Sequence, residues 1–180
     1  MAALAVGCAA APPRSVPAHA QIAQDVQLEL PLPPNFPRAQ TLHQLGRARW
    51  GERTLAFDAV LTLSPDAAEI VIAAASGPRL ATIAWDKSGV RRTLAARAPR
   101  DIPVENLLAD VFLLLWPAEA VAAALPADIS LAESPDGARI LRRAGQVLVE
   151  ITPDPVQPAR TLIRNHAFGY EVSVLSQSLD

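Results

Sequence analysis

The sequence predicts a mainly β (α+β) protein, in which a curved antiparallel half-barrel of about nine to eleven strands is covered by a central helical lid. Two observations predict this fold. From residue 40 onwards, apolar and polar residues alternate in segments of about six to ten residues, which is the period of half-buried strands. One long apolar stretch, residues 107–126, interrupts this alternation. The chain of 180 residues is long enough for one domain with a sizeable core.

The stretch RTLAFDAVLTLSPD, residues 53–66, shows the alternation most clearly. Turn residues at Gly77-Pro78 and at 87–89 separate the segments that follow, and the alternation resumes after the apolar stretch. Short connections between consecutive strands predict an antiparallel meander. One face of the strand over 53–63 carries Leu55, Phe57, Ala59, Leu61 and Leu63.

The apolar stretch LLADVFLLLWPAEAVAAALP, residues 107–126, predicts two short helices divided at Pro117. Apolar residues surround the first helix almost completely, so it must be buried on more than one side. The stretch is too short and too interrupted to span a membrane. A sheet of many strands curls, and its apolar face needs a cover. We therefore expect residues 103–125 to form a lid against the strand that carries Phe57 and Leu61, because no other segment is apolar enough for this role.

The N-terminal residues resemble a bacterial lipoprotein signal. Small apolar residues lead to the single cysteine, Cys8, as in the lipobox, whose cysteine is acylated and becomes the mature N-terminus. Residues 1–7 are expected to be part of a longer signal peptide, and the acyl chains on Cys8 are expected to anchor the protein to a membrane. Prolines are frequent up to residue 37, so residues 8–27 are expected to form a lipidated N-terminus and flexible tether, before a domain over 28–180.

Composition and residue spacing argue against nucleic-acid binding and against catalysis. The net charge is −2 and the arginines are spread along the chain, so no basic patch for nucleic acid is predicted. No metal-ligand spacing or cofactor motif occurs, and Ser76 lacks the glycine two residues earlier that a nucleophile elbow needs. His43 with Glu52 or Asp58 is a candidate acid–base pair, although a single strand histidine is more often a solvated surface residue. We expect no enzymatic activity, no cofactor and no metal.

The strand order, the helical insert ending in LLLWPAEAVAAALP and the closing strands in RTLIRNHAFGYEVSVLSQSLD resemble a family of bacterial lipoproteins of unknown function, over roughly residues 28–180. That family is often encoded in gene clusters for aryl polyene lipids. Its fold is similar to that of the lipoprotein carriers LolA and LolB, a curved half-barrel capped by helices around an apolar cavity for acyl chains. The resemblance implies a location at the periplasmic face of the outer membrane of a Gram-negative bacterium. The turn at residues 76–79 lacks the protruding leucine of LolB, which implies a different lipid cargo.

The walls of any cavity under the lid are expected to come from the lid and from the strands that face it. Trp50, Trp85 and Trp116 either line such a cavity or fill a core, because packing density cannot be read from a sequence. The same two alternatives hold for the residues expected to line the cavity, which are Phe57, Leu61, Leu63, Ile70, Ile72, Trp85, Leu108, Phe112, Leu115 and Trp116.

Two functions from different classes follow. The first is a carrier or acceptor that binds a lipid or the acyl chains of a lipoprotein, serves aryl polyene lipid transport, and is held at the membrane by the lipid anchor on Cys8. The second is a non-catalytic structural or adaptor lipoprotein that holds a protein partner of a biosynthetic or export machinery. An empty space under the lid favours the first function, and a filled space favours the second.

Overall fold

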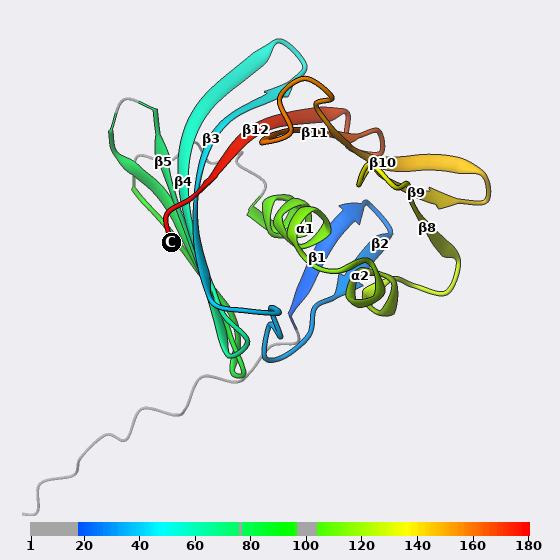
Figure 1. The fold of residues 1–180 in the computed structure, drawn as a ribbon, viewed down its shortest axis with the longest axis horizontal. Helices are drawn as coiled ribbons and strands as arrows, with labels where there is room; N and C mark the ends of the chain where they lie inside the picture. The colour runs from blue at the N-terminus through cyan, green and yellow to red at the C-terminus, as the bar shows by residue number, and fades with distance from the viewer. Residues whose placement is uncertain (1–17, 76, 97–103) are drawn as a thin grey trace, which may run out of the picture.

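The computed structural model describes residues 18–75, 77–96 and 104–180. Its main feature is an antiparallel sheet of ten strands, and a separate hairpin pairs β1 with β2. Figure 1 shows the large sheet curving around both helices and this hairpin. The edge strands β7 and β8 do not pair with each other, so the sheet is not closed into a barrel. The strands are β1 His19–Ala23, β2 Val26–Glu29, β3 Gln40–Trp50, β4 Arg53–Leu63, β5 Ala67–Ala74, β6 Arg79–Asp86, β7 Gly89–Leu94, β8 Ile129–Glu133, β9 Arg139–Arg143, β10 Gln146–Pro153, β11 Arg160–Asn165 and β12 Tyr170–Ser178.

Two meanders make up the large sheet. Strands β3 to β7 form one and strands β8 to β12 form the other, and they join where β3 pairs with β12 in the middle of the sheet. Between β7 and β8 the chain passes from one edge of the sheet to the other through the two helices. This arrangement confirms the predicted mainly β class and the large antiparallel sheet with helices between its two halves.

The helices α1 (Val104–Leu115) and α2 (Ala118–Ala124) follow each other closely, and Pro117 is the N-cap residue of α2. The expected division at Pro117 is therefore confirmed. Figure 1 places α1 inside the curve of the sheet. The side chains of Leu108 and Phe112 are fully buried, as the apolar surface all around α1 predicts. Within the described residues, neither helix has the length and apolar character needed to cross a membrane.

The sequence predicts a flexible tether over residues 8–27, but in the described part of this range, residues 18–27, the chain forms an ordered hairpin. Strands β1 and β2 pair with each other, and the Asn165 side chain donates a hydrogen bond of 3.0 Å to the backbone oxygen of Ile22. The hairpin shares the covering of the sheet with the helices, so the expectation that no other segment could serve as a cover is also wrong. Short alanine side chains made this strand pattern difficult to see. Residues 1–17, which include Cys8 and the first part of the expected tether, lie outside the described residues. The buried apolar residues around this hairpin are Ala18, Ala20, Ile22, Ala23, Val26, Leu28 and Leu30.

Two buried tryptophans occupy the centre of the core. The rings of Trp85 on β6 and Trp116 after α1 stack with their centroids 5.0 Å apart. Phe112 contacts both rings, with centroid distances of 6.1 Å to Trp85 and 5.2 Å to Trp116. The indole N–H of Trp85 donates to the backbone oxygen of Pro31 at 2.9 Å, and that of Trp116 donates to the oxygen of Pro34 at 2.8 Å. The proline-rich segment before β3 is therefore fixed against the end of α1.

The C-terminal end of α1 is held by a buried arginine. Arg139 on β9 is 9% exposed, and its guanidinium donates to the backbone oxygens of Leu113 at 2.6 Å and Trp116 at 2.7 Å. Glu133 on β8 pairs with the same guanidinium at 3.0 Å. The last carbonyl groups of a helix have no partner within the helix, and a cation at this end also interacts favourably with the helix dipole. Arg139 supplies both the hydrogen bonds and the charge.

Phe112→Ala is expected to lower the free energy of unfolding by roughly 3–5 kcal/mol, because it removes a fully buried ring from a filled core. Leu115→Ala on the same helix is the matched control. It should cost less, because the Leu115 side chain is only partly buried. Urea unfolding of both variants measures the difference, and equal losses would contradict the packing around Phe112.

Candidate functional site

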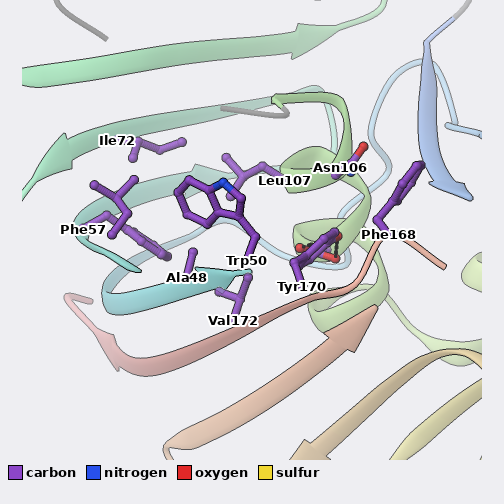
Figure 2. Close-up of a pocket in the computed structure, with 11 residues that line it drawn as sticks. Ala48, Trp50, Phe57, Ile72, Asn106, Leu107, Phe168, Tyr170 and Val172 are labelled. Atoms are coloured by element: carbon purple, nitrogen blue, oxygen red, sulfur yellow. Dashed lines mark hydrogen bonds between the residues drawn. The ribbon is translucent and has the colours of Figure 1, made fainter. Parts of the chain in front are cut away.

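The space between α1 and the curved sheet is not filled along its whole length. A pocket of about 250 Å³ lies beside the N-terminal half of α1. Figure 2 shows its lining side chains, which come from α1, from the sheet and from the turn between β11 and β12. Most of them are apolar, so the pocket offers an environment for an apolar ligand. The lining residues are Ala48, Trp50, Leu55, Phe57, Ile72, Asn106, Leu107, Asp110, Phe168, Tyr170 and Val172.

A narrow space of about 20 Å³ continues from this pocket between α1 and the sheet. Its walls include Leu61 and Ile70, together with residues that also line the pocket, such as Phe57 and Ile72. In the walls of two wider hollows, of about 320 and 350 Å³, polar atoms take a larger share of the surface than they do in the apolar pocket. The first of these hollows contains Glu171, which pairs with arginines from neighbouring strands. The apolar pocket is therefore the better candidate for a ligand site, although it is not the largest hollow.

The residues that the sequence assigns to a cavity separate into three groups. Phe57 and Ile72 line the pocket, and Leu61 and Ile70 line its narrow continuation. Leu115 is half-buried and packs against the core. The remaining residues lie in the filled core, at most 1% exposed, and they are Leu63, Trp85, Leu108, Phe112 and Trp116.

The three tryptophans divide in the same way. Trp85 and Trp116 are core residues, whereas Trp50 is half-buried and lines the pocket at the end of β3. Figure 2 shows the Trp50 ring among the apolar side chains of the pocket. Half-buried Phe168, in the turn between β11 and β12, adds a second aromatic ring to the lining. These partly accessible aromatic residues supply large apolar contact area at the opening of the pocket.

A buried polar network crosses one side of the pocket. The Tyr170 hydroxyl donates to the Asp110 carboxyl group, at 2.9 Å from Oδ1 and 3.0 Å from Oδ2. Asn165 contacts the same hydroxyl at 3.4 Å, and its own side-chain oxygen accepts a hydrogen bond of 2.8 Å from the backbone N–H of Phe168. The network thus connects α1 to β12 and to the turn before β12.

The environment of Asp110 favours its protonated form. Asp110 is 4% exposed, and burial raises the pKa of its carboxyl group to about 7, although the hydrogen bond from Tyr170 lowers it in part. Burial and the nearby Asp110 carboxyl group raise the pKa of Tyr170 above its ordinary value. Among the described residues, the titratable group that contacts Asp110 is Tyr170. A carboxylic acid that is neutral near pH 7 can both donate and accept hydrogen bonds.

Asn106 is the other polar residue of α1 that lines the pocket. It is 7% exposed and lies one helical turn before Asp110, so both side chains lie on the same face of α1. Neither residue was among those that the sequence singled out for the cavity. A signal was present, because Asn106 and Asp110 are two of the three polar residues in α1 and lie four positions apart. The partner of Asp110, Tyr170, is distant in sequence.

Gly46 determines where the Phe57 ring lies. Gly46 on β3 pairs with Phe57 on β4, and a Cβ atom at position 46 would lie 2.0 Å from Cζ of the Phe57 ring. Atoms cannot approach this closely, so the ring can lie against the β3 backbone only because residue 46 has no side chain. The wall of the pocket at Phe57 therefore depends on a glycine that does not line it.

The candidate acid–base pair lies elsewhere. His43 Nε2 is 2.6 Å from Asp58 Oδ1, with both side chains about a third exposed, so the structure brings together one of the two pairings proposed for His43. Neither residue lines the apolar pocket. Among the described residues, no group of three or more His, Cys, Asp or Glu side chains is arranged to hold a metal ion. Ser76 lies outside the described residues.

Asp110→Asn is expected to change how stability depends on pH. An unfolded Asp110 ionises near pH 4, whereas the folded carboxyl group ionises near pH 7, so the folded state holds the extra proton and loses stability as the pH rises between these values. From about pH 5 to about pH 8 this loss is roughly 2–3 kcal/mol. Asparagine accepts the Tyr170 hydrogen bond but does not ionise, so the variant should lack this loss. Urea unfolding at both pH values measures it, and identical pH dependence in both proteins would contradict the buried, protonated state.

A comparison with curated proteins finds no match to the chain. A comparison with family models finds one match, described as "Protein of unknown function (DUF3261)", over residues 41–178. This range runs from the second residue of β3 to the end of β12, so it contains the ten-stranded sheet except Gln40, both helices and all the residues that line the pocket. The match covers well over half of the chain, and the chain therefore belongs to the DUF3261 family of proteins of unknown function.

Proposed function

We propose that this protein binds an apolar chain, such as an acyl chain of a lipid or lipoprotein, in the pocket beside α1. The observation that carries this proposal is an apolar pocket of about 250 Å³ between a buried helix and the concave face of an open sheet. An empty apolar pocket lacks the contacts that a filled core makes, and an apolar ligand restores them. Each methylene group moved from water into such a pocket contributes about 0.8 kcal/mol.

The size of the pocket limits the ligand. Typical ligand pockets have about 300–1,000 Å³, so this one takes a single short chain or one end of a longer chain. The narrow space between α1 and the sheet, of about 20 Å³, is too small for more than about one water-sized group, so the inner end of such a chain stops beside it. The half-buried rings of Trp50 and Phe168 then cover its outer end.

We further propose that the protein acts as a carrier or acceptor at the periplasmic face of the outer membrane, anchored through acyl chains on Cys8. The support for the anchor is the lipobox-like sequence, and the support for a role in aryl polyene lipid transport is the resemblance to lipoproteins encoded with that pathway. A single apolar pocket beside a membrane is suited to passing one chain between a membrane and a partner.

The second candidate is a structural or adaptor lipoprotein that holds a protein partner. The filled core around Trp85, Phe112 and Trp116 favours it, because much of the space inside the curved sheet holds side chains. This candidate needs no ligand in the pocket. Binding of a small apolar probe therefore separates the two functions.

Ala48→Phe is expected to weaken binding of an apolar probe by at least about tenfold. Ala48 lines the pocket, so the added ring occupies volume that the ligand needs. Leu45→Phe is the matched control, because Leu45 lies on the same strand and is 50% exposed. The measurement is an NMR titration of the ¹⁵N-labelled protein with 1-decanol, followed at the indole N–H signals.

The three indole signals provide an internal control for this titration. Trp50 lines the pocket, and its signal should shift in the wild type. The indole groups of Trp85 and Trp116 are bonded to backbone oxygens in the core, so their signals should stay in place. No shift of the Trp50 signal with any apolar probe would overturn the binding function and favour the adaptor.

Cys8→Ser is expected to release the protein from the membrane fraction when it is expressed with a complete signal peptide. Acyl chains on Cys8 would supply most of the membrane affinity, and serine cannot receive them in this way. Cell fractionation measures the change, and mass spectrometry of the wild type detects the lipid directly. Membrane association that is unchanged in the variant would overturn the proposed anchor.

A further inference from the structure

The apolar pocket contains two buried polar side chains on the same face of α1. Asn106 is 7% exposed and Asp110 is 4% exposed, and both line the pocket. Side chains four residues apart on a helix have their Cβ atoms about 5–6 Å apart, so a small group between them can contact both. Fully apolar side chains at these positions would suit a pocket for a plain hydrocarbon better.

Asn106 has hydrogen-bonding capacity that the described part of the chain does not use. Its amide group has two N–H donors and an oxygen acceptor, and none of the described residues forms a hydrogen bond with them. Among the described residues, every fully buried side-chain nitrogen or oxygen atom has a hydrogen-bond partner, so the amide atoms of Asn106 that have none are exposed to the space of the pocket. The position of Asn106 in the lining makes this capacity available to a molecule in the pocket.

Asp110 supplies hydrogen-bond acceptors beside the donors of Asn106. Its two oxygens receive the hydroxyl of Tyr170, which occupies only part of their accepting capacity. Tyr170 also holds the carboxyl group in place, because its own hydroxyl is contacted by Asn165. Asn106 can therefore donate to an oxygen atom while Asp110 accepts a hydrogen from the same atom. A hydroxyl group is the simplest group that uses both.

We propose that the pocket selects an apolar chain that carries an uncharged hydroxyl group, as in an alcohol or a protonated carboxylic acid, and that Asn106 and Asp110 bind this group. The inference rests on the proposed binding of an apolar chain and specifies its class. Without Asn106 and Asp110, the same pocket would bind any chain of suitable size.

The pocket disfavours an anionic group. None of its lining residues is Lys or Arg, so a carboxylate would enter an apolar site without a cation and next to Asp110. Burial raises the pKa of Asp110 to about 7, so below this pH the site also has little charge with which to attract a cation. Both facts favour an uncharged group on the ligand.

The test compares probes that share one chain length. The NMR titration at the Trp50 indole signal gives dissociation constants for 1-decanol, decanoic acid and 1-chlorodecane, with the wild type and with Asn106→Leu. The ratio of the dissociation constant for 1-chlorodecane to that for 1-decanol should be about fivefold to tenfold higher in the wild type than in Asn106→Leu, which is the effect of about one net hydrogen bond. Asn106→Leu keeps a similar volume and keeps Asp110, so its affinity for 1-chlorodecane should not fall. Asn106→Ala serves the same purpose if the leucine variant does not fold.

Each outcome supports or overturns the inference. Decanoic acid and 1-decanol are both measured at about pH 5 and about pH 8, because Asp110 also titrates in this range. Binding of decanoic acid that falls more at the higher pH than binding of 1-decanol does shows that the protonated acid is a source of the hydroxyl group. A ratio that is the same in the wild type and in Asn106→Leu overturns the inference and leaves the apolar-binding function standing. Equally tight binding of ionised decanoate also overturns it. Failure of every probe to shift the Trp50 signal overturns both the inference and the proposed function.

Discussion

Two buried hydrogen bonds from Arg139, to the backbone oxygens of Leu113 and Trp116, hold the C-terminal end of α1 inside the curved sheet. A helix that is buried on all sides cannot leave its last carbonyl groups to water, so a partner must come from the surrounding structure. With this end fixed, Trp116 stacks on Trp85, and both indole groups bind the proline-rich segment before β3. Nearer the N-terminal end of α1, beside Asn106, Leu107 and Asp110, the pocket lies between the helix and the sheet.

The polar network near that end of α1 lowers the stability of the fold. A function in binding would explain why these polar residues are present. Burial of Asp110 costs free energy whenever the carboxyl group ionises, and Tyr170 offsets only part of this cost. An apolar residue at position 110 would avoid the cost, because apolar replacements of buried polar groups are often neutral or stabilising. The network also has a structural effect, since Asn165 connects Tyr170 to the N-terminal hairpin at Ile22. Polar groups retained in an apolar pocket are nevertheless typical of binding sites.

The sequence was sufficient to predict the antiparallel strands, the division of the helices at Pro117 and the position of α1 against the strand with Phe57 and Leu61. These features have strong local signals, because alternation and prolines act within a few residues. The hairpin of β1 and β2 was missed because alanines weaken the alternation beside many prolines. The pairing of Asp110 with Tyr170 was missed because it joins residues that are distant in sequence. Its one local trace was Asp110 itself, a charged residue within the apolar stretch over 107–126.

Whether a buried aromatic residue fills a core or lines a pocket is decided by what lies beside it in space. Phe57 illustrates this point, because its ring lies over Gly46 on the neighbouring strand, where even one added carbon would overlap it. A larger residue at position 46 would push the ring away from the backbone, and the nearest free volume is the pocket itself. The pocket therefore depends on two features. Gly46 has no side chain to displace the Phe57 ring, and Arg139 fixes the C-terminal end of α1. Alternation places Phe57 on the inner face of the sheet, but the cross-strand pairing with Gly46 determines how much space remains above the ring.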